Sequence, residues 1–255
     1  MIKTMLIDNS LCMGCRGCQG ACKQWNQLPA EKTEFVGTYE NPPRFSANTW
    51  TKVAFREFEE EGKESWVFTK LGCMHCVDAA CEKACPAAAI SHNEFGSVVV
   101  DEKKCIACNY CVANCTFNVM GFDRVDNVAR KCTFCSDRVA AGEMPACAKA
   151  CPTGAITYGD RPELMSLASS RVRELRANGF PKAEIYGADE VGGTMMLYVL
   201  KEGKAGAEEK YGLPEDPNVP MAAIIWDYLF KPVRVVLVGA LALALWANRN
   251  DSKKV

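Results

Sequence analysis

The sequence predicts an α+β protein in which one cysteine-rich module is nested inside another, with a β-hairpin insertion and a C-terminal transmembrane helix. Three observations lead to this expectation. Sixteen cysteines form four groups of four, two segments between the first and second groups alternate apolar and polar residues, and a long uncharged run lies near the C-terminus. Alternation with a period of two is typical of strands, and long uncharged runs are typical of membrane helices.

Composition narrows the class of protein. The 255 residues include 30 Lys and Arg against 31 Asp and Glu, a formal net charge of −1. A nucleic-acid-binding protein needs a basic surface to meet phosphates, so no nucleic-acid partner is expected. The proportions of hydrophobic (49%) and charged (24%) residues are ordinary for a folded protein, which excludes disorder over most of the chain.

The cysteines repeat one spacing. The first and third groups read C-x2-C-x2-C-x3-C, the second widens one gap to four residues, and the fourth has eleven residues in its middle gap. The groups are Cys12, Cys15, Cys18 and Cys22; Cys73, Cys76, Cys81 and Cys85; Cys105, Cys108, Cys111 and Cys115; and Cys132, Cys135, Cys147 and Cys151. In bacterial ferredoxins this spacing directs three thiolates to one iron–sulfur cube and the fourth to its neighbour. We therefore expect two nested bacterial ferredoxin-like 2x(4Fe-4S) modules.

Sixteen cysteines supply four ligands to each of four 4Fe-4S clusters, with iron as the only metal. Soft thiolates also suit zinc, but zinc sites normally use C-x2-C pairs separated by longer loops. Structural zinc and disulfides are therefore the weaker alternatives. Each oxidised cube with its thiolates carries roughly −2, so four cubes add about −8 and make the loaded protein acidic.

Short strands are expected on either side of the cysteine loops. Residues 4–8 and 98–101 lead into the first and third groups, and residues 89–90 and 155–158 follow the second and fourth. The second and third groups are neighbours and should form the inner module, around which the first and fourth close. The expected domains are an outer module at 1–30 plus 126–160, an insertion at 31–72, an inner module at 73–125, a peripheral region at 161–220 and a membrane helix at 221–249.

Three further segments carry a clear pattern. Residues 51–58 and 65–70 alternate around a turn at Gly62, which predicts a hairpin. Residues 162–178 predict an amphipathic helix, and residues 195–200 a further strand. The expected apolar face of the helix is Leu164, Leu167, Ala168, Val172 and Leu175. These segments are interpreted as packing and partner-facing surface.

The tail is interpreted as one tilted or kinked membrane span over residues 221–248. Its uncharged part, 235–248, is shorter than the roughly 20 residues that cross a bilayer, but the apolar residues 221–230 precede it. Lys231 and Arg234 interrupt the two parts, and long basic side chains near a helix end reach the interface. A buried core helix is the alternative. The basic residues favour a cytoplasmic C-terminus, which places the clusters on the periplasmic or outer face.

With these residues identified, the chain resembles the iron–sulfur β-subunit of membrane-bound, N-type formate dehydrogenases, within the four-cluster subunits of molybdopterin oxidoreductases. The similarity runs from LIDNSLCMGCRGCQGACKQWN near the N-terminus to WDYLFKP before the tail. The cysteine pattern alone selects only the broad four-cluster family. The segments YENP, SANTW and GGTMMLYVL point to the formate dehydrogenase branch.

The resemblance implies one cysteine set for each cluster. Set A is Cys12, Cys15, Cys18 and Cys151; set B is Cys22, Cys132, Cys135 and Cys147; set C is Cys73, Cys76, Cys81 and Cys115; and set D is Cys85, Cys105, Cys108 and Cys111. It also implies an electron-transfer subunit that is not itself a catalyst. Electrons would pass from a molybdopterin (Mo or W) α-subunit that oxidises formate to a membrane cytochrome b γ-subunit and quinone. We expect no signal peptide here, since the resemblance implies that the catalytic subunit carries the export signal.

Two other roles stay open: the same relay for a different molybdopterin oxidoreductase, and a free polyferredoxin carrier, against which the apolar tail argues. No residues suggest a substrate site, so no catalytic residue is expected. Thr116 stands where the family usually has proline, which concerns backbone shape rather than ligation. His75 is expected to fill space or donate a hydrogen bond. Arg16, Lys83 and Lys149 are candidates for offsetting cluster charge, or lie on a solvated face.

Overall fold

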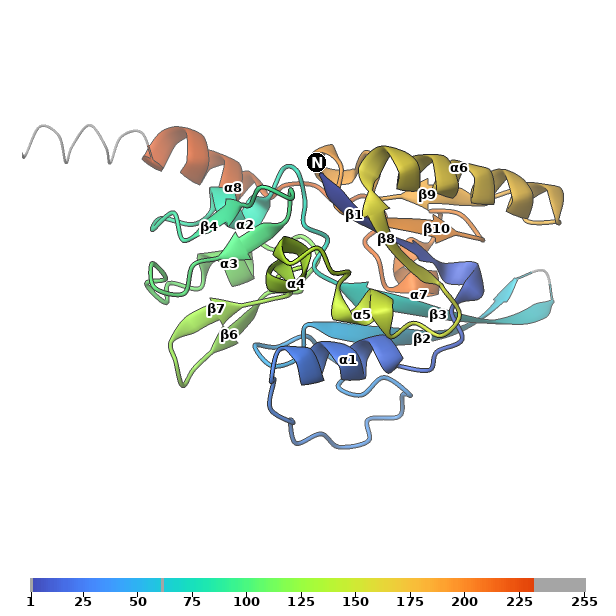
Figure 1. The fold of residues 1–255 in the computed structure, drawn as a ribbon, viewed down its shortest axis with the longest axis horizontal. Coiled ribbons are helices and arrows are strands. Elements are labelled where there is room, and N and C mark those ends of the chain that lie inside the picture. The colour runs from blue at the N-terminus through green and yellow to red at the C-terminus, as the bar shows by residue number, and fades with distance from the viewer. Residues whose placement is uncertain (1, 61, 232–255) are drawn as a thin grey trace, which may run out of the picture.

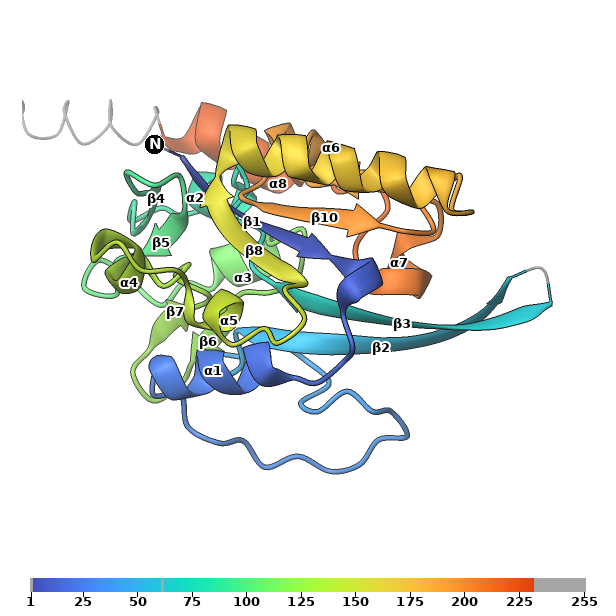
Figure 2. The ribbon, with the colours of Figure 1, turned by 45° about the vertical axis from the view of Figure 1, so that its right-hand side comes forward.

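The computed structural model describes residues 2–60 and 62–231, apart from the side chains of Glu60 and Lys63. Helix α6 (Arg161–Ala177) covers one face of a four-stranded sheet, and the cysteine loops with their short helices lie on the other side (Figures 1 and 2). The long hairpin lies beyond the sheet on the same side as the cysteine loops. The mixed α and β content agrees with the predicted class.

The four-stranded sheet joins distant parts of the sequence. Strand β1 (Lys3–Asp8) pairs antiparallel with β8 (Ile156–Asp160) and parallel with β10 (Met196–Leu200), which pairs antiparallel with β9 (Glu184–Tyr186). Successive side chains of a strand point to opposite faces. The side chains that contact α6 are Leu6, Leu197 and Val199. Those that face the cysteine loops are Met5, Ile7, Met196, Tyr198 and Leu200.

The strand pairing has the nested order that the sequence predicts. β1 precedes the first cysteine group and β8 follows the fourth, so their pairing brings the ends of the cysteine region together. Between the second and third groups, β4 (Ile90–His92) pairs antiparallel with β5 (Val98–Val100). The domain boundaries themselves stay a prediction.

The hairpin predicted in the insertion is confirmed. β2 (Thr51–Glu60) and β3 (Lys63–Gly72) pair antiparallel along their whole length, and the outer part of the hairpin extends away from the body (Figure 2). The inner part is buried: Val53, Val67 and Leu71 belong to the same apolar core as β1 and β10. The inner part of the hairpin therefore packs against the region that holds the cysteines.

The predicted amphipathic helix is α6, with one correction. Leu164, Ala168, Val172 and Leu175 are buried against the sheet as expected, but Leu167 is 47% exposed. Its place on the buried face is wrong, because position 167 lies at the edge of a stripe centred on the other four. One side of α6 thus seals the sheet.

The predicted strand at 195–200 is β10, but it is not peripheral. β10 lies between β1 and β9, and all five of its side chains are buried. Of the expected role as packing and partner-facing surface, the packing is confirmed for this strand, and the partner-facing surface is wrong because all five side chains are buried. Its parallel pairing with β1 joins residues far apart in sequence, which a local pattern does not encode.

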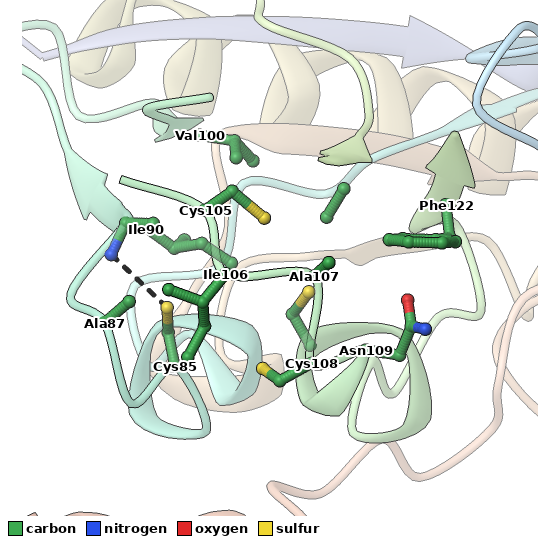
Figure 3. Close-up of a pocket in the computed structure, with 13 residues that line it drawn as sticks. Cys85, Ala87, Ile90, Val100, Cys105, Ile106, Ala107, Cys108, Asn109 and Phe122 are labelled. Atoms are coloured by element: carbon green, nitrogen blue, oxygen red, sulfur yellow. Dashed lines mark hydrogen bonds between the residues drawn. The ribbon is translucent and has the colours of Figure 1, made fainter. Parts of the chain in front are cut away.

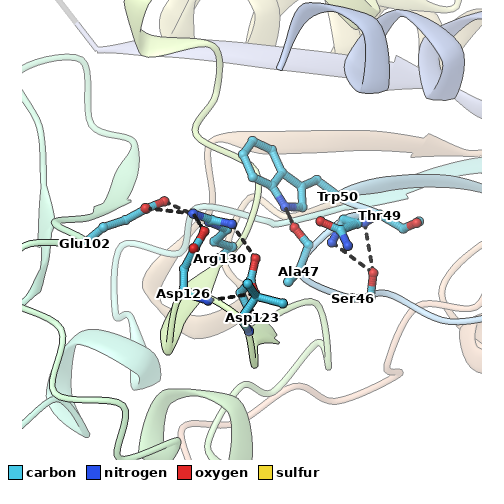
Figure 4. Close-up of polar contacts among 10 residues, drawn as sticks. Ser46, Ala47, Thr49, Trp50, Glu102, Asp123, Asp126 and Arg130 are labelled. Atoms are coloured by element: carbon cyan, nitrogen blue, oxygen red, sulfur yellow. Dashed lines mark hydrogen bonds and ion pairs between the residues drawn. The ribbon is translucent and has the colours of Figure 1, made fainter. Parts of the chain in front are cut away.

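A second small hairpin was not predicted. β6 (Gly121–Asp123) pairs antiparallel with β7 (Val128–Arg130). The Arg130 guanidinium forms ion pairs with Asp123, with Asp126 at 2.7 Å and with Glu102 at 3.1 Å (Figure 4). These contacts tie the hairpin to the segment just before the third cysteine group.

The remaining elements are short. They are η1 (Asn9–Leu11), α1 (Gly17–Trp25), α2 (Ala80–Lys83), α3 (Tyr110–Ala113), α4 (Ser136–Ala140), α5 (Ala146–Lys149), η2 (Glu190–Gly192), α7 (Ala207–Tyr211), α8 (Met221–Ile225) and η3 (Trp226–Phe230). In the described part of the chain, no helix is long and apolar enough to cross a membrane. Residues 232–248 of the predicted span lie outside the described residues.

Candidate metal centres

Each cysteine loop leads into a short helix that holds later cysteines of its group. Helix α1 carries Cys18 and Cys22, and helices α2, α3 and α5 carry Cys81, Cys111 and Cys147. Two-residue gaps place the earlier thiolates on the loop, and the helix turns the following residues away from it. This local geometry lets one group supply ligands to two different places.

One backbone feature repeats in all four groups. The residue before the second cysteine has a positive φ: 70° at Gly14, 49° at His75, 60° at Ala107 and 60° at Phe134. Such angles are uncommon for residues with a side chain, and successive turned peptides direct N–H groups to one side. The Phe134 N–H, for example, donates to the Cys132 sulfur at 3.4 Å. Sequence reasoning did not identify this position, although its fixed place in C-x2-C is the signal.

A second turn follows the last cysteine of three groups. Ala88, Asn118 and Gly154 each lie three residues after that cysteine and have φ of 49°, 52° and 68°. The third group therefore makes the same turn as the others, although Thr116 replaces proline there. The Thr116 hydroxyl donates to the Asn218 carbonyl at 3.0 Å, so this substitution adds a contact without changing the turn.

Three pockets are each lined by the four cysteines of one implied set. In the pocket of set D, Cys85, Cys105 and Cys108 point toward a common space between Ile90 and Phe122 (Figure 3). Two other pockets are lined by all of set B and all of set A. The space within the pockets of sets D, B and A, including the part open to solvent, is about 350, 290 and 360 Å³.

The cysteines of set C also lie together. Burial raises the pKa of Cys76, and the neighbouring charges that raise it further are those of Cys73, Cys81 and Cys115. Cys115 is thus close to the cysteines of the second group. Such a position is required if the last cysteine of the third group binds the cluster of the second group.

The donor set fits iron–sulfur cubes. Among the described residues, no three His, Cys, Asp or Glu side chains are arranged to hold a single ion. The sulfurs of sets A, B and D instead surround a space with mostly apolar walls, which suits a cube with one thiolate on each iron.

Burial controls the protonation of these thiols. It raises the pKa of Cys18 and Cys135 to about 12 and of Cys132 to about 11. Without iron, these thiols are protonated and neutral at pH 7, and iron must displace their protons to bind. The sites are therefore built for a cofactor whose metal neutralises the thiolates.

Exposure differs between the sets. All four cysteines of set B are buried, whereas Cys15 of set A is exposed. The residue after the first loop cysteine of sets A and D is also exposed: Met13 by 59% and Ile106 by 61%. Sets A and D therefore reach the surface beside an apolar side chain, and set B lies deep in the molecule.

Two cations absent from the sequence analysis lie among the cysteines. Lys70 and Lys131 are 1% and 3% exposed. Of the cations proposed from the sequence, Arg16 lies over the Phe55 ring at 4.6 Å and also lines the set A pocket, whereas Lys83 pairs with Asp78 at 2.8 Å. Lysine normally lies on the surface, so no sequence signal marked the buried pair.

His75 packs inside the molecule as expected. It is fully buried, and its ring lies edge-on to Phe134 at 5.1 Å between centroids. Its Nδ1 lies 3.1 Å from the Val98 nitrogen and 3.2 Å from the Val98 carbonyl oxygen, so the ring tautomer sets whether it accepts from the N–H or donates to the carbonyl. Burial, then Lys131 and Lys70, hold its pKa well below the usual value, so the ring is neutral. The space-filling role is confirmed.

Comparison with known proteins adds the family context. A family model described as a 4Fe-4S dicluster domain matches residues 64–161, which contain the second, third and fourth cysteine groups. The nitrate-inducible formate dehydrogenase iron–sulfur subunit of Escherichia coli (strain K12) is 45% identical over 230 residues, 89% of this chain and 78% of the relative. The formate dehydrogenase iron–sulfur subunit of Haemophilus influenzae is 43% identical over 94% of this chain and 77% of the relative. The formate dehydrogenase-O iron–sulfur subunit of E. coli is 42% identical over 91% and 77%.

Proposed function

Because the chain belongs to the family of formate dehydrogenase iron–sulfur subunits, we propose that its four cysteine sets form a path for electrons through the molecule. The protein is an electron-transfer subunit of a formate dehydrogenase complex, its cofactors are 4Fe-4S clusters, and it is not the catalytic subunit. The observation that carries this function is the succession of four cysteine sets, from set A, which reaches the surface at Cys15, through the wholly buried set B to the partly buried sets C and D.

The ligand sets proposed for the four clusters are sets A, B, C and D as defined above. The three pockets lined by sets A, B and D, and the grouping of set C around Cys76, support this assignment. Bound there, the clusters supply one-electron oxidation and reduction. The chain's own residues hold the sulfurs at fixed positions and keep water from set B, whose four cysteines are all buried.

The order A–B–C–D follows from which sets lie within reach of each other's charge. The neighbouring pairs are Cys18 of A with Cys147 of B, Cys132 of B with Cys73 of C, and Cys81 of C with Cys111 of D. The described residues give no such pair between A and D. Electrons therefore enter at one end set and leave at the other.

The start of the C-terminal segment indicates which end set passes electrons to the membrane partner. The Trp226 ring packs on Tyr110 beside Cys111 of set D, with 5.5 Å between ring centroids. Helix α8 also packs on α2, where Ala223 contacts Ala80 and Ala84. The start of the predicted membrane segment thus lies against the helices that carry sets C and D. We place the membrane cytochrome b at set D and the molybdopterin catalytic subunit at set A.

The membrane anchor is a proposal of its own. Residues 221–248 form the anchor, with the cluster-bearing part on the periplasmic face and the C-terminus in the cytoplasm. A chain that ends after Lys231 should keep its iron and leave the membrane fraction, because the uncharged run is gone. A chain lacking only residues 250–255 is the matched control and should stay with the membranes. Cell fractionation measures both, and a full-length chain found free of membranes would contradict the anchor.

The function is tested by purifying the tagged chain in mild detergent and measuring formate-dependent reduction of a viologen dye. We expect activity together with a large pterin-containing subunit. Iron-rich protein with a large partner but without formate activity would assign the relay to another molybdopterin oxidoreductase. Iron-rich monomer without partners would instead favour a free carrier.

A further inference from the structure

Lys70 is a buried ammonium without an ordinary counter-ion. It lies near the end of β3, only 1% exposed, and its Nζ has no hydrogen-bond partner among the described atoms. No carboxylate of the described residues forms an ion pair with it. The surroundings are tight, because a Cβ on Gly72 would lie 3.2 Å from this Nζ. The ammonium is thus held in place by packing.

Lys131 is the second such group. It follows β7, is 3% exposed, and donates to the carbonyls of Val98 and, at 3.1 Å, Cys132. These two carbonyls accept two of its three protons but do not neutralise its charge. As with Lys70, the described residues offer no carboxylate partner. An unpaired buried charge is strongly unfavourable, so both lysines need a source of negative charge nearby.

The negative charge near each lysine comes from cysteine sulfur of two different sets. Lys70 lines the pocket of set A. Burial lowers its pKa, but the charges of Cys147, Tyr198, Cys132 and Cys18 raise it overall. Burial likewise lowers the pKa of Lys131, which Cys73 and Cys81 of set C and Cys132 of set B raise overall. Both ammonium groups therefore stay charged when the sulfurs are ionised.

We propose that Lys70 and Lys131 are fixed counter-charges between successive clusters, Lys70 serving A and B and Lys131 serving B and C. This inference rests on the proposed ligand sets. A cluster becomes more negative when it accepts an electron, so a nearby cation stabilises the reduced form and raises the reduction potential. Their burial keeps solvent and salt from screening the effect. The reduction potential of cluster B, which lies beside both lysines, is raised most. The potential of cluster D is not raised.

The test is a redox titration of the purified complex, followed by electron paramagnetic resonance. Lys70→Met and Lys131→Met remove each charge while keeping the length of the side chain, and Lys149→Met is the control for an exposed lysine of the cysteine region. Each neutral variant should lower the potential of two clusters. At a fixed potential the ratio of reduced to oxidised cluster should fall about tenfold, equal to 59 mV for one electron.

The pattern across variants identifies the clusters. One signal must shift in both Lys70→Met and Lys131→Met, one must shift in each alone, and the fourth must stay unchanged in both. Unchanged potentials, a uniform shift of all four signals, or two pairs without a shared signal would each overturn the proposal. Should the methionine variants lose iron, Lys70→Arg and Lys131→Arg decide: retention of all clusters supports a need for charge, and their loss overturns it. Wild-type protein without four cluster signals would instead contradict the ligand sets.

Discussion

Replacing Cys111 and Cys115 by alanine, one at a time, should remove two different clusters although the two residues lie on one short segment. Cys111 lines the pocket with Cys85, Cys105 and Cys108, whereas Cys115 lies with set C. Each variant should lose about four irons, because one cube needs all four of its thiolates. Electron paramagnetic resonance should show a different missing signal in each. Formate-dependent quinone reduction should fall to background in both, since the path is cut.

The matched control for these variants is Thr116→Ala. It removes one hydrogen bond, to the Asn218 carbonyl, and should cost about 1 kcal/mol without loss of iron. Loss of the same signal from Cys111→Ala and Cys115→Ala would show that the third group binds one cluster by itself. A full complement of iron in either variant would exclude that cysteine as a ligand.

Gly121→Ala should be among the most destabilising single substitutions in the chain. A Cβ at this position would lie 2.1 Å from the backbone nitrogen of Ala47 and from the carbonyl carbon of Ser46. Backbone atoms cannot yield as a flexible side chain does, and this loop is held by the Trp50 indole N–H donating to the Ala47 carbonyl at 2.7 Å (Figure 4). We expect the free energy of unfolding to fall by at least about 3 kcal/mol. Chemical denaturation of the iron-loaded protein measures it.

Gly20→Ala is the control for the same chemical change. Gly20 lies inside α1, is exposed, and has no atom within 4 Å of the added Cβ. Alanine is the better helix former, so this variant should be more stable by up to about 1 kcal/mol. Equal stability of the two variants would mean that the contact between the 46–50 loop and β6 is not tight.

The parts of the fold predicted from sequence are those that local pattern encodes. The 51–72 hairpin alternates with a period of two around a turn, and α6 has a helical stripe, so both were predicted. The place of β10 depends on a parallel pairing across most of the chain, for which no local signal exists. The strands β6 and β7 are three residues long, too short for alternation to be recognised.

The candidate site divides in the same way. Cysteine spacing identified the cofactor class because thiolate chemistry and loop length are both visible in the sequence. The positive φ at Phe134 cannot be predicted from the residue type, since phenylalanine does not favour it, and only the fixed place before the second cysteine of C-x2-C signals it. Lys70 and Lys131 were missed for a related reason: a lysine is expected at the surface unless its surroundings are known.

The pairing of β1 with β8 and β10 also sets an order for biosynthesis. A ribosome releases the chain from its N-terminus, so sets C and D have all their ligands once Cys115 has emerged. Sets B and A wait for Cys147 and Cys151, and β1 lacks its parallel neighbour until β10 is made. Under the proposed ligand sets, the inner module can be loaded on the nascent chain. The first cysteine loop, although synthesised earliest, must be kept from premature oxidation until the chain is almost complete.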